Sequence, residues 1–184
     1  MRVIAGSARS LPLKAPEGLD TRPTQDRIKE TLFNILQNDI PECVFVDMFA
    51  GSGGIGIEAL SRGAKKAYFI DNSPAAAACI TENLAFTKLT DRAILFKSDV
   101  SSALYNVYEK HVDIIFMDPP YSKGIEKQIL ELLNTVKYCD DETLIIIESE
   151  IHNDFSYVEE MGYEITREKT YKNNKHVFIH KKKV

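Results

Sequence analysis

Short apolar runs alternate with helical segments along most of this chain, and this alternation constrains the fold more than any other feature. Residues 43–47, 66–71, 93–97, 112–118 and 143–147 have the length and composition of buried strands. Residues 55–62, 74–86, 100–108 and 125–136 are the predicted helices between and after them. Repeated strand-helix units form right-handed crossovers, so the pattern predicts a mostly parallel sheet with helices on both faces.

The two ends of the chain depart from this alternation. Residues 163–171 and 175–180 read as strands joined by Asn173-Asn174, a pair typical of hairpin turns. Residues 1–24 are rich in Pro, Gly and Arg and predict a short strand or hairpin followed by irregular chain. Thr24 is predicted to cap a helix beginning near Gln25. We therefore expect a seven-stranded α/β sheet with a C-terminal antiparallel hairpin and an N-terminal extension.

The composition fits one globular domain. The chain has 184 residues, of which 44% are hydrophobic. No apolar run approaches the roughly 20 residues of a membrane-spanning helix, and no signal-peptide core follows Met1. Cys43, Cys79 and Cys139 are widely spaced, which favours reduced thiols over disulfides or a zinc site, and the histidines also lack metal-ligand spacing. These features predict a cytoplasmic protein with no membrane contact and no metal.

Charge is distributed unevenly along the chain. The net charge of −4 taken alone argues against a nucleic-acid partner. Residues 1–16 nevertheless carry +3 and residues 163–184 carry +5, which leaves −12 on the segment between them. Two basic ends flanking an acidic body are either ordinary solvated segments or contacts for a polyanion, and the charge pattern alone favours neither.

A glycine-rich turn follows the first predicted strand. Gly51, Gly53 and Gly56 have the spacing of a dinucleotide-binding turn, and Asp71 closes the second strand. Asp47 argues against a dinucleotide, because a carboxylate there would repel a pyrophosphate. It suits a ligand with a cationic amine or sulfonium, and S-adenosylmethionine (SAM) has both. The glycines would let the backbone approach such a ligand, and Asp71 would accept hydrogen bonds from its ribose.

The third strand runs into Ser98-Asp99-Val100. Asp99 could accept a hydrogen bond from an adenine amino group. Ser98 or Asp99 could equally cap the following helix. The residues leave both interpretations open.

The fourth strand ends in Asp118-Pro119-Pro120-Tyr121. Two prolines can neither continue a strand ladder nor enter a helix interior, so they hold this loop extended. The Asp118 carboxylate and the Pro119 carbonyl are acceptors, and Tyr121 offers an aromatic face. Together they predict a clamp for a planar group that carries N–H bonds. The alternative is a stiff turn in which Tyr121 only fills space.

The two motifs together resemble those of class I SAM-dependent methyltransferases that modify exocyclic amino groups. Arg2-Val3-Ile4-Ala5-Gly6 and residues 22–34 (RPTQDRIKETLFN) narrow the resemblance. They are similar to the RsmD-type family, which methylates N2 of a guanine in 16S, small-subunit ribosomal RNA. The resemblance covers essentially the full length and implies a Rossmann-like class I methyltransferase fold.

Carried over position by position, the resemblance implies a SAM site, a base clamp and an RNA-contacting extension of residues 1–24. The cofactor would be bound by Asp47, Phe49, Gly51, Ser52, Gly53, Gly56, Asp71, Asn72, Asp99, Val100 and Thr24. The catalytic residues would be Asp118, Pro119 and Tyr121, and the substrate would contact Pro120, Tyr121, Arg2, Arg9, Lys14 and Arg22. The implied partner is 16S ribosomal RNA in an assembling small subunit, bound by a monomeric enzyme.

The implied reaction is direct methyl transfer to an amino group of a base that has left its stack. Asp118 and the Pro119 carbonyl would accept the hydrogens of that amino group as charge develops on nitrogen. No cysteine lies near Pro119-Pro120, which excludes the nucleophilic-cysteine route to pyrimidine C5. By the residues alone, guanine N2, adenine N6 and cytosine N4 all fit, and only the resemblance selects guanine.

Three other functions compete with this one. A glutamine-N5 protein methyltransferase shares the clamp, usually with Asn before the prolines and with an additional substrate domain. An adenine-N6 nucleic-acid methyltransferase normally carries a target-recognition domain, for which this chain has no room. A catalytically silent RNA-binding module would tolerate the loss of Asp118.

Overall fold

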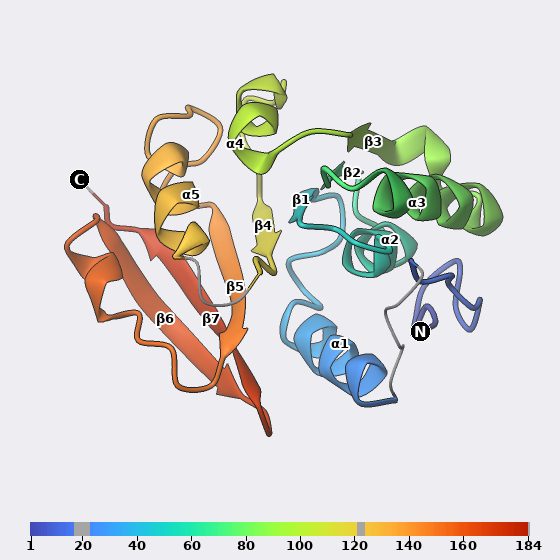
Figure 1. Cartoon of the computed structure of the whole chain (residues 1–184), viewed down its shortest axis with the longest axis horizontal. Helices are drawn as coiled ribbons and strands as arrows, with labels where there is room; N and C mark the ends of the chain where they lie inside the picture. The colour runs from blue at the N-terminus through green and yellow to red at the C-terminus, as the bar shows by residue number, and fades with distance from the viewer. Residues whose placement is uncertain (17–22, 121–123, 184) are drawn as a thin grey trace.

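The computed structural model describes residues 1–16, 23–120 and 124–183, apart from the side chains of Pro23 and Thr24. Its centre is one sheet in the order β3-β2-β1-β4-β5-β7-β6 (Figure 1). Five strands form the parallel part of the sheet, and neighbours within this part pair in the parallel direction. They are β1 (Val44–Met48), β2 (Lys66–Ile70), β3 (Ala93–Phe96), β4 (Ile114–Met117) and β5 (Leu144–Glu150). The predicted parallel part of the sheet is confirmed.

The C-terminal hairpin completes the sheet. Strand β7 (Asn174–Lys181) lies between β5 and β6 (Tyr163–Thr170) and runs antiparallel to both. The backbone N–H of Tyr171 donates to the carbonyl of Asn174 at 2.8 Å and closes the turn. The predicted hairpin is therefore confirmed, and its second strand, rather than its first, joins it to the sheet.

Helices cover both faces of the sheet (Figure 1). They are α1 (Pro23–Ile35), α2 (Gly54–Ser61), α3 (Pro74–Thr87), α4 (Val100–Ala103) and α5 (Ile125–Leu133), with 3-10 turns at Thr90–Arg92, Leu104–Asn106 and Ser156–Glu159. Helices α1, α2 and α3 share one apolar core with Phe45 and Phe116. Helices α4 and α5 share the other core with Val46 and Ile115. Successive strand residues thus serve opposite faces, as strand geometry requires.

The N-terminal segment is a tight loop closed by one antiparallel bridge, between Arg2 and Pro12. The N–H of Val3 donates to the carbonyl of Leu11 at 3.0 Å. Val3, Ala8 and Leu13 are buried in the same core as α1, α2 and α3. Within residues 1–16, the predicted hairpin therefore takes the form of this single bridge, and apolar side chains fix it to the helices.

Three local predictions were wrong, the first being the helix predicted over 125–136, which ends at Leu133. Helix α1 begins at Pro23, so Thr24 lies in its first turn and is not the residue that caps it. Proline is well suited to the first helical position because its fixed φ matches the helix and its missing N–H needs no partner. The helix predicted to reach Tyr108 ends at Asn106, because Val107 takes an extended backbone (φ −78°, ψ 110°) and is buried.

Two further observations concern the chain as a whole. Cys43, Cys79 and Cys139 are buried free thiols, as predicted. Among the described residues, none of the helices combines the length and the apolar character that a membrane span requires.

Candidate functional site

The predicted acidic residues gather at the carboxyl edge of the sheet. Asp47 lies near the end of β1, Asp71 follows β2, Asp99 precedes α4 after β3, and Asp118 follows β4. These four strands are parallel neighbours, so their carboxyl ends open at the same edge. The sheet therefore brings together four carboxylates that are widely separated in the chain.

Asp47 is buried beneath the glycine-rich turn. Its Oδ2 accepts a hydrogen bond from the backbone N–H of Gly56 at 2.9 Å. Burial raises the pKa of this carboxyl well above its usual range, the Gly56 N–H opposes the rise, and the neighbouring Asp118 and Asp71 add to it. A carboxyl in this position is most stable as an anion when a cation lies beside it.

The glycines of this turn serve two purposes. Gly51 and Gly53 adopt left-handed conformations, with φ of +56° and +77°. At Gly56, a Cβ would lie 2.4 Å from the Phe69 ring, so packing of α2 on the sheet already requires glycine there. Phe49 is left-handed as well (φ +59°), which costs a residue with a side chain free energy and is typical of functional turns.

Asp71 and Asp99 differ in what their side chains already bind. Asp71 accepts hydrogen bonds from the backbone N–H groups of Gly51 and Ser73, both at 2.9 Å, and thereby ties the glycine-rich turn to the end of β2. Asp99 accepts from the Asn72 side chain at 2.9 Å. Although Asp99 precedes α4, its side chain makes no capping hydrogen bond. Of the two interpretations of Asp99, the side-chain cap is therefore not realised.

A cavity of about 1080 Å³ opens at this edge, between α1, the ends of β1 and β4, and the β6–β7 turn. The predicted site residues among its lining are Asp47, Phe49, Gly51, Ser52 and Asp118. Asp71, Asn72, Asp99 and Val100 lie outside its lining, at the adjoining edge. The site is thus divided between a deep cavity and the neighbouring strand ends.

The proline loop separates this cavity from a smaller one of about 310 Å³, which Pro119 and Pro120 line. Asp118 lines the larger cavity at its mouth, and the residue as a whole is exposed. Loss of water around its carboxyl group, and secondarily the charge of Glu148, raise the pKa of Asp118 to about 7. Tyr121, Arg22 and the Thr24 side chain, which the sequence also assigned to the site, lie outside the described residues.

A second cluster in the cavity was not predicted. Glu148 at the end of β5 accepts a hydrogen bond from the Asn174 Nδ2 at 2.6 Å and lies 3.2 Å from His176 Nε2. The other ring nitrogen of His176 lies 3.1 Å from the Tyr171 hydroxyl. All four residues line the cavity beside Asp118. Sequence analysis assigned none of the histidines to the site, and the structure places His176 in the cavity lining, 1% exposed.

One sequence signal could have revealed Glu148. It follows the apolar run 143–147, so it is a carboxylate at the end of a buried strand, like Asp47 and Asp118. His176 carries no comparable signal, because its partner Glu148 lies 28 residues away and meets it only through the antiparallel register of β5 and β7.

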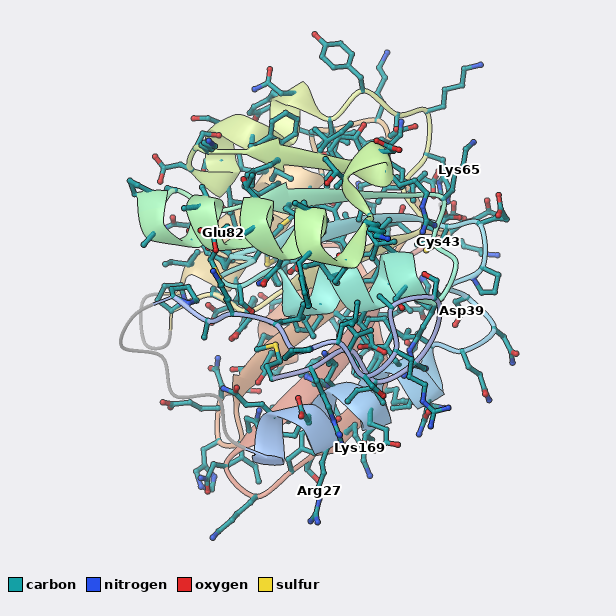
Figure 2. All side chains as sticks on the ribbon, turned by 90° about the vertical axis from the view of Figure 1, so that its right-hand side faces the viewer. Arg27, Asp39, Cys43, Lys65, Glu82 and Lys169 are labelled. Atoms are coloured by element: carbon teal, nitrogen blue, oxygen red, sulfur yellow. The ribbon has the colours of Figure 1, made fainter. Side chains whose placement is uncertain are left out.

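The predicted RNA-binding residues of the N-terminal segment are largely engaged elsewhere. Arg2 lies 3.8 Å from Asp26, and Lys14 forms an ion pair with Glu82 of α3. Figure 2 shows Glu82 beside the N-terminal segment and Arg27 projecting from α1. Neither Lys14 nor Arg9 lines the cavity, whereas Arg27 and Lys172 do.

The attachment of this segment depends on a buried ionic cluster. Glu58 of α2 is inaccessible to solvent and accepts hydrogen bonds from the N–H groups of Ile4 (2.8 Å) and Ala5 (3.0 Å). The same carboxylate pairs with Lys29 of α1 at 3.2 Å and with Arg62 at 2.8 Å. Lys29 also donates to the Arg2 carbonyl. These contacts give Lys29 a structural role that sequence analysis did not reveal.

One further group of potential metal ligands lies outside the cavity lining. The ligand atoms of His111, Asp140 and Glu142 lie within 4.8 Å of one another. Asp140 already accepts hydrogen bonds from His111 Nδ1 (2.9 Å) and from the Glu142 N–H (3.0 Å). This group stabilises the turn before β5.

Comparison with known proteins identifies the family. Residues 1–180 match the family model described as "Conserved hypothetical protein 95". The "Ribosomal RNA small subunit methyltransferase D" of Escherichia coli (strain K12) is 38% identical over 153 residues, covering 83% of this chain and 76% of the relative. Its Haemophilus influenzae counterpart of the same name is 35% identical over 174 residues, covering 92% and 88%.

Solved structures agree with these relatives. The structure described as "Putative methyltransferase yhhF from Escherichia coli" superposes with a TM-score of 0.85 at 35% identity, over 99% of this chain and 98% of that one. The strand order, the carboxylates at the strand ends and these relatives together establish the class I methyltransferase fold. The chain therefore belongs to the ribosomal RNA small subunit methyltransferase D family, and by this homology it is a methyltransferase.

Proposed function

We propose that this protein transfers the methyl group of SAM to the exocyclic N2 amino group of a guanine in small-subunit ribosomal RNA. The observation that carries the proposal is the position of Asp118, which lines one cavity together with Asp47 and the glycine-rich turn. A cofactor bound at the turn and an amino group held by Asp118 would therefore meet in the same space. The names of the relatives support ribosomal RNA as the substrate.

The residues at this edge fit SAM. Asp47 is a buried carboxylate with one oxygen bonded to Gly56, and its raised pKa is opposed by a cationic ligand. Asp71 and Asp99 place acceptors at the adjoining strand ends, where ribose and adenine groups would donate. When bound, SAM supplies an electrophilic methyl carbon whose bond to sulfur breaks as the bond to nitrogen forms.

Asp118 would orient the amino group and accept its proton. A carboxylate accepts hydrogen bonds and donates none, so Asp118 directs the nitrogen lone pair away from itself. Loss of the N–H proton to Asp118 leaves the neutral methylated amine. A pKa of about 7 keeps a large fraction of Asp118 ionised at neutral pH and makes it an effective proton acceptor.

Two residues of the proline loop would hold the base. Pro119 is buried and lies beyond Met117, the last paired residue of β4, so its carbonyl can accept a second hydrogen bond from the amino group. We assign Tyr121, which follows Pro120, to stacking on the base. Both assignments extend the Asp-Pro-Pro-Tyr interpretation.

Arg27 and Lys172 line the cavity and are candidates for phosphate contacts near the extruded nucleotide. We further propose that the enzyme acts as a monomer on an assembling subunit.

The proposal is tested with tritiated SAM and small-subunit particles from a strain that lacks this gene, followed by nucleoside analysis. We expect the label in N2-methylguanosine. Label in another nucleoside would contradict the guanine-N2 assignment, and label in protein would contradict the RNA substrate. The Asp118→Asn variant is the control, because it should bind SAM and transfer almost no label.

A further inference from the structure

Glu148 and Asp118 lie side by side in the cavity. The parallel register of β4 and β5 pairs Met117 with Ile147, so Asp118 and Glu148 occupy the next positions of adjacent strands. Both residues line the larger cavity, and the charge of Glu148 acts on Asp118. The base-binding end of the cavity therefore presents two carboxylates, of which the sequence motif contains only one.

The orientation of Glu148 is fixed by the hairpin. Its Oε1 accepts from Asn174 at 2.6 Å, and its Oε2 lies 3.2 Å from His176 Nε2. An ionised carboxylate can only accept, so His176 Nε2 carries the proton and Nδ1 accepts from the Tyr171 hydroxyl at 3.1 Å. The Tyr171 hydroxyl keeps its proton, because burial and Glu148 raise its pKa to about 12.

Aromatic rings enclose the histidine. His176 meets Phe116, Phe178 and Tyr171 edge to face, with ring centroids 5.9, 6.4 and 5.1 Å apart. The Glu148 side chain is 18% exposed, so part of it remains accessible from the cavity. Each carboxylate oxygen has two lone pairs, and Asn174 and His176 use one on each oxygen. The Glu148 carboxylate is thus fixed in orientation and can still accept further hydrogen bonds.

Glu148 would be a third hydrogen-bond acceptor beside the Asp118 carboxylate and the Pro119 carbonyl. It can distinguish bases that those two acceptors cannot distinguish. Two acceptors satisfy the amino group of guanine, adenine or cytosine equally well. Beside its amino group, guanine carries N1–H, a donor, whereas adenine and cytosine carry a ring nitrogen with a lone pair. A fixed carboxylate attracts the first and repels the second. Contiguous N–H donors between Asp118 and Glu148 would also relieve the repulsion between the two carboxylates.

We propose that Glu148, oriented by Asn174 and His176, is the residue that selects guanine, by accepting the N1–H next to the amino group held by Asp118. This inference rests on the proposed function and adds to it the group that recognises the base. It assigns the hairpin a direct role in specificity, because two of its residues hold the selecting carboxylate.

The test compares guanosine with 2,6-diaminopurine at the target position. Diaminopurine keeps the N2 amino group but has a lone pair at N1 and an amino group in place of O6, so the two substrates differ at both positions. The part of the preference that depends on N1 is the part that changes when Glu148 is replaced. Once the target is mapped, splint-ligated RNA carrying either base is assembled into particles, and kcat/KM is measured for wild type and Glu148→Gln. The amide of glutamine is nearly isosteric with the carboxylate and can donate to a ring nitrogen.

We expect the wild-type enzyme to prefer guanosine by about 10-fold or more, and Glu148→Gln to lose most of that preference. Glu164→Gln, an exposed residue of β6, removes the same charge and should keep it. Asn174→Ala keeps the carboxylate but removes one of its donors, and should reduce the preference by a smaller factor. The unfolding midpoint and SAM affinity of each variant check that the fold is intact.

The outcomes separate the two proposals. If the wild-type enzyme leaves guanosine particles unlabelled, the proposed function fails and this inference with it. If guanosine is methylated but the preference is the same in wild type, Glu148→Gln and Asn174→Ala, the methyltransferase assignment stands and Glu148 does not select the base.

Discussion

The N-terminal segment and the C-terminal region with the β6–β7 hairpin both have a net positive charge, yet they are placed differently relative to the cavity. Residues of segment 1–14 are fixed to α1, α2 and α3 through Lys29, Glu58 and Asn83. The hairpin instead presents Tyr171 and Lys172 of its turn and His176 of β7 to the cavity. Similar charge in the sequence therefore corresponds to a structural attachment in one region and to part of the candidate site in the other.

The largest effect should come from breaking the attachment of the N-terminal segment. In Glu58→Ala, Lys29 and Arg62 lose their buried partner, and the N–H groups of Ile4 and Ala5 lose their acceptor. We expect the free energy of unfolding to fall by about 3–5 kcal/mol, measured by urea denaturation. A loss below about 1 kcal/mol would show that the segment is not held in this way.

The next largest effect should be the loss of turnover when Asp118, which lies in the cavity beside Glu148, is replaced. Asp118→Asn keeps the shape of the side chain but removes the proton acceptor. We expect kcat to fall about 10²- to 10³-fold. SAM affinity by calorimetry should stay within about twofold of wild type, because in our proposal Asp118 contacts the base and not the cofactor. An equal loss of SAM affinity and turnover would contradict this division of roles.

A pH profile of the reaction tests whether the charge of Glu148, which the hairpin holds, raises the pKa of Asp118. Since the reaction requires the ionised carboxylate, kcat/KM should rise with pH and level off above an inflection near 7. Below that inflection, the rate should fall about tenfold for each pH unit. The charge of Glu148 raises the pKa of Asp118, so the inflection should move to lower pH in Glu148→Gln. An unchanged inflection would show that the two carboxylates do not interact.

The smallest expected effect is on RNA affinity, when one lysine is removed from each of the two basic regions. Lys172→Ala removes a charge from the cavity rim and should weaken RNA binding several-fold, lowering the slope of log affinity against log salt by about 1. Lys14→Ala breaks an exposed pair with Glu82 and should change RNA affinity little. The comparison of the two regions fails if Lys14→Ala weakens RNA binding more than Lys172→Ala does.

Much of the fold follows from local pattern. The runs that form β1, β2 and β4 are largely buried and nearly continuous in apolar residues, and Asp residues near their ends mark where these strands stop. Strand β3 is half-buried throughout. The alternation alone therefore assigns Asp47 and Asp118 to one edge of the sheet. The Thr24 cap failed because the helix begins at Pro23, two residues before the predicted start at Gln25. The helix toward Tyr108 failed because burial of Val107 outweighed its helical pattern.

What the sequence could not provide is contact between distant residues. Glu58 finds the N–H of Ile4 across 54 positions, and His176 finds Glu148 across 28. Neither pair has a spacing that periodicity detects, because tertiary packing and strand register decide which side chains meet. Net charge was equally uninformative for the N-terminal segment, since the partner of Lys14 is Glu82 of α3.

The placement of β7 inside the sheet has a consequence for synthesis of the protein. Residues emerge from the ribosome in chain order, so β5 and β6 exist before the strand that lies between them. Until β7 arrives, the apolar run Ile145-Ile146-Ile147 lies on an unpaired edge that another chain could join. The same strand brings His176 and Asn174 to Glu148. A chain interrupted before β7 would therefore be both prone to aggregation and without part of its cavity.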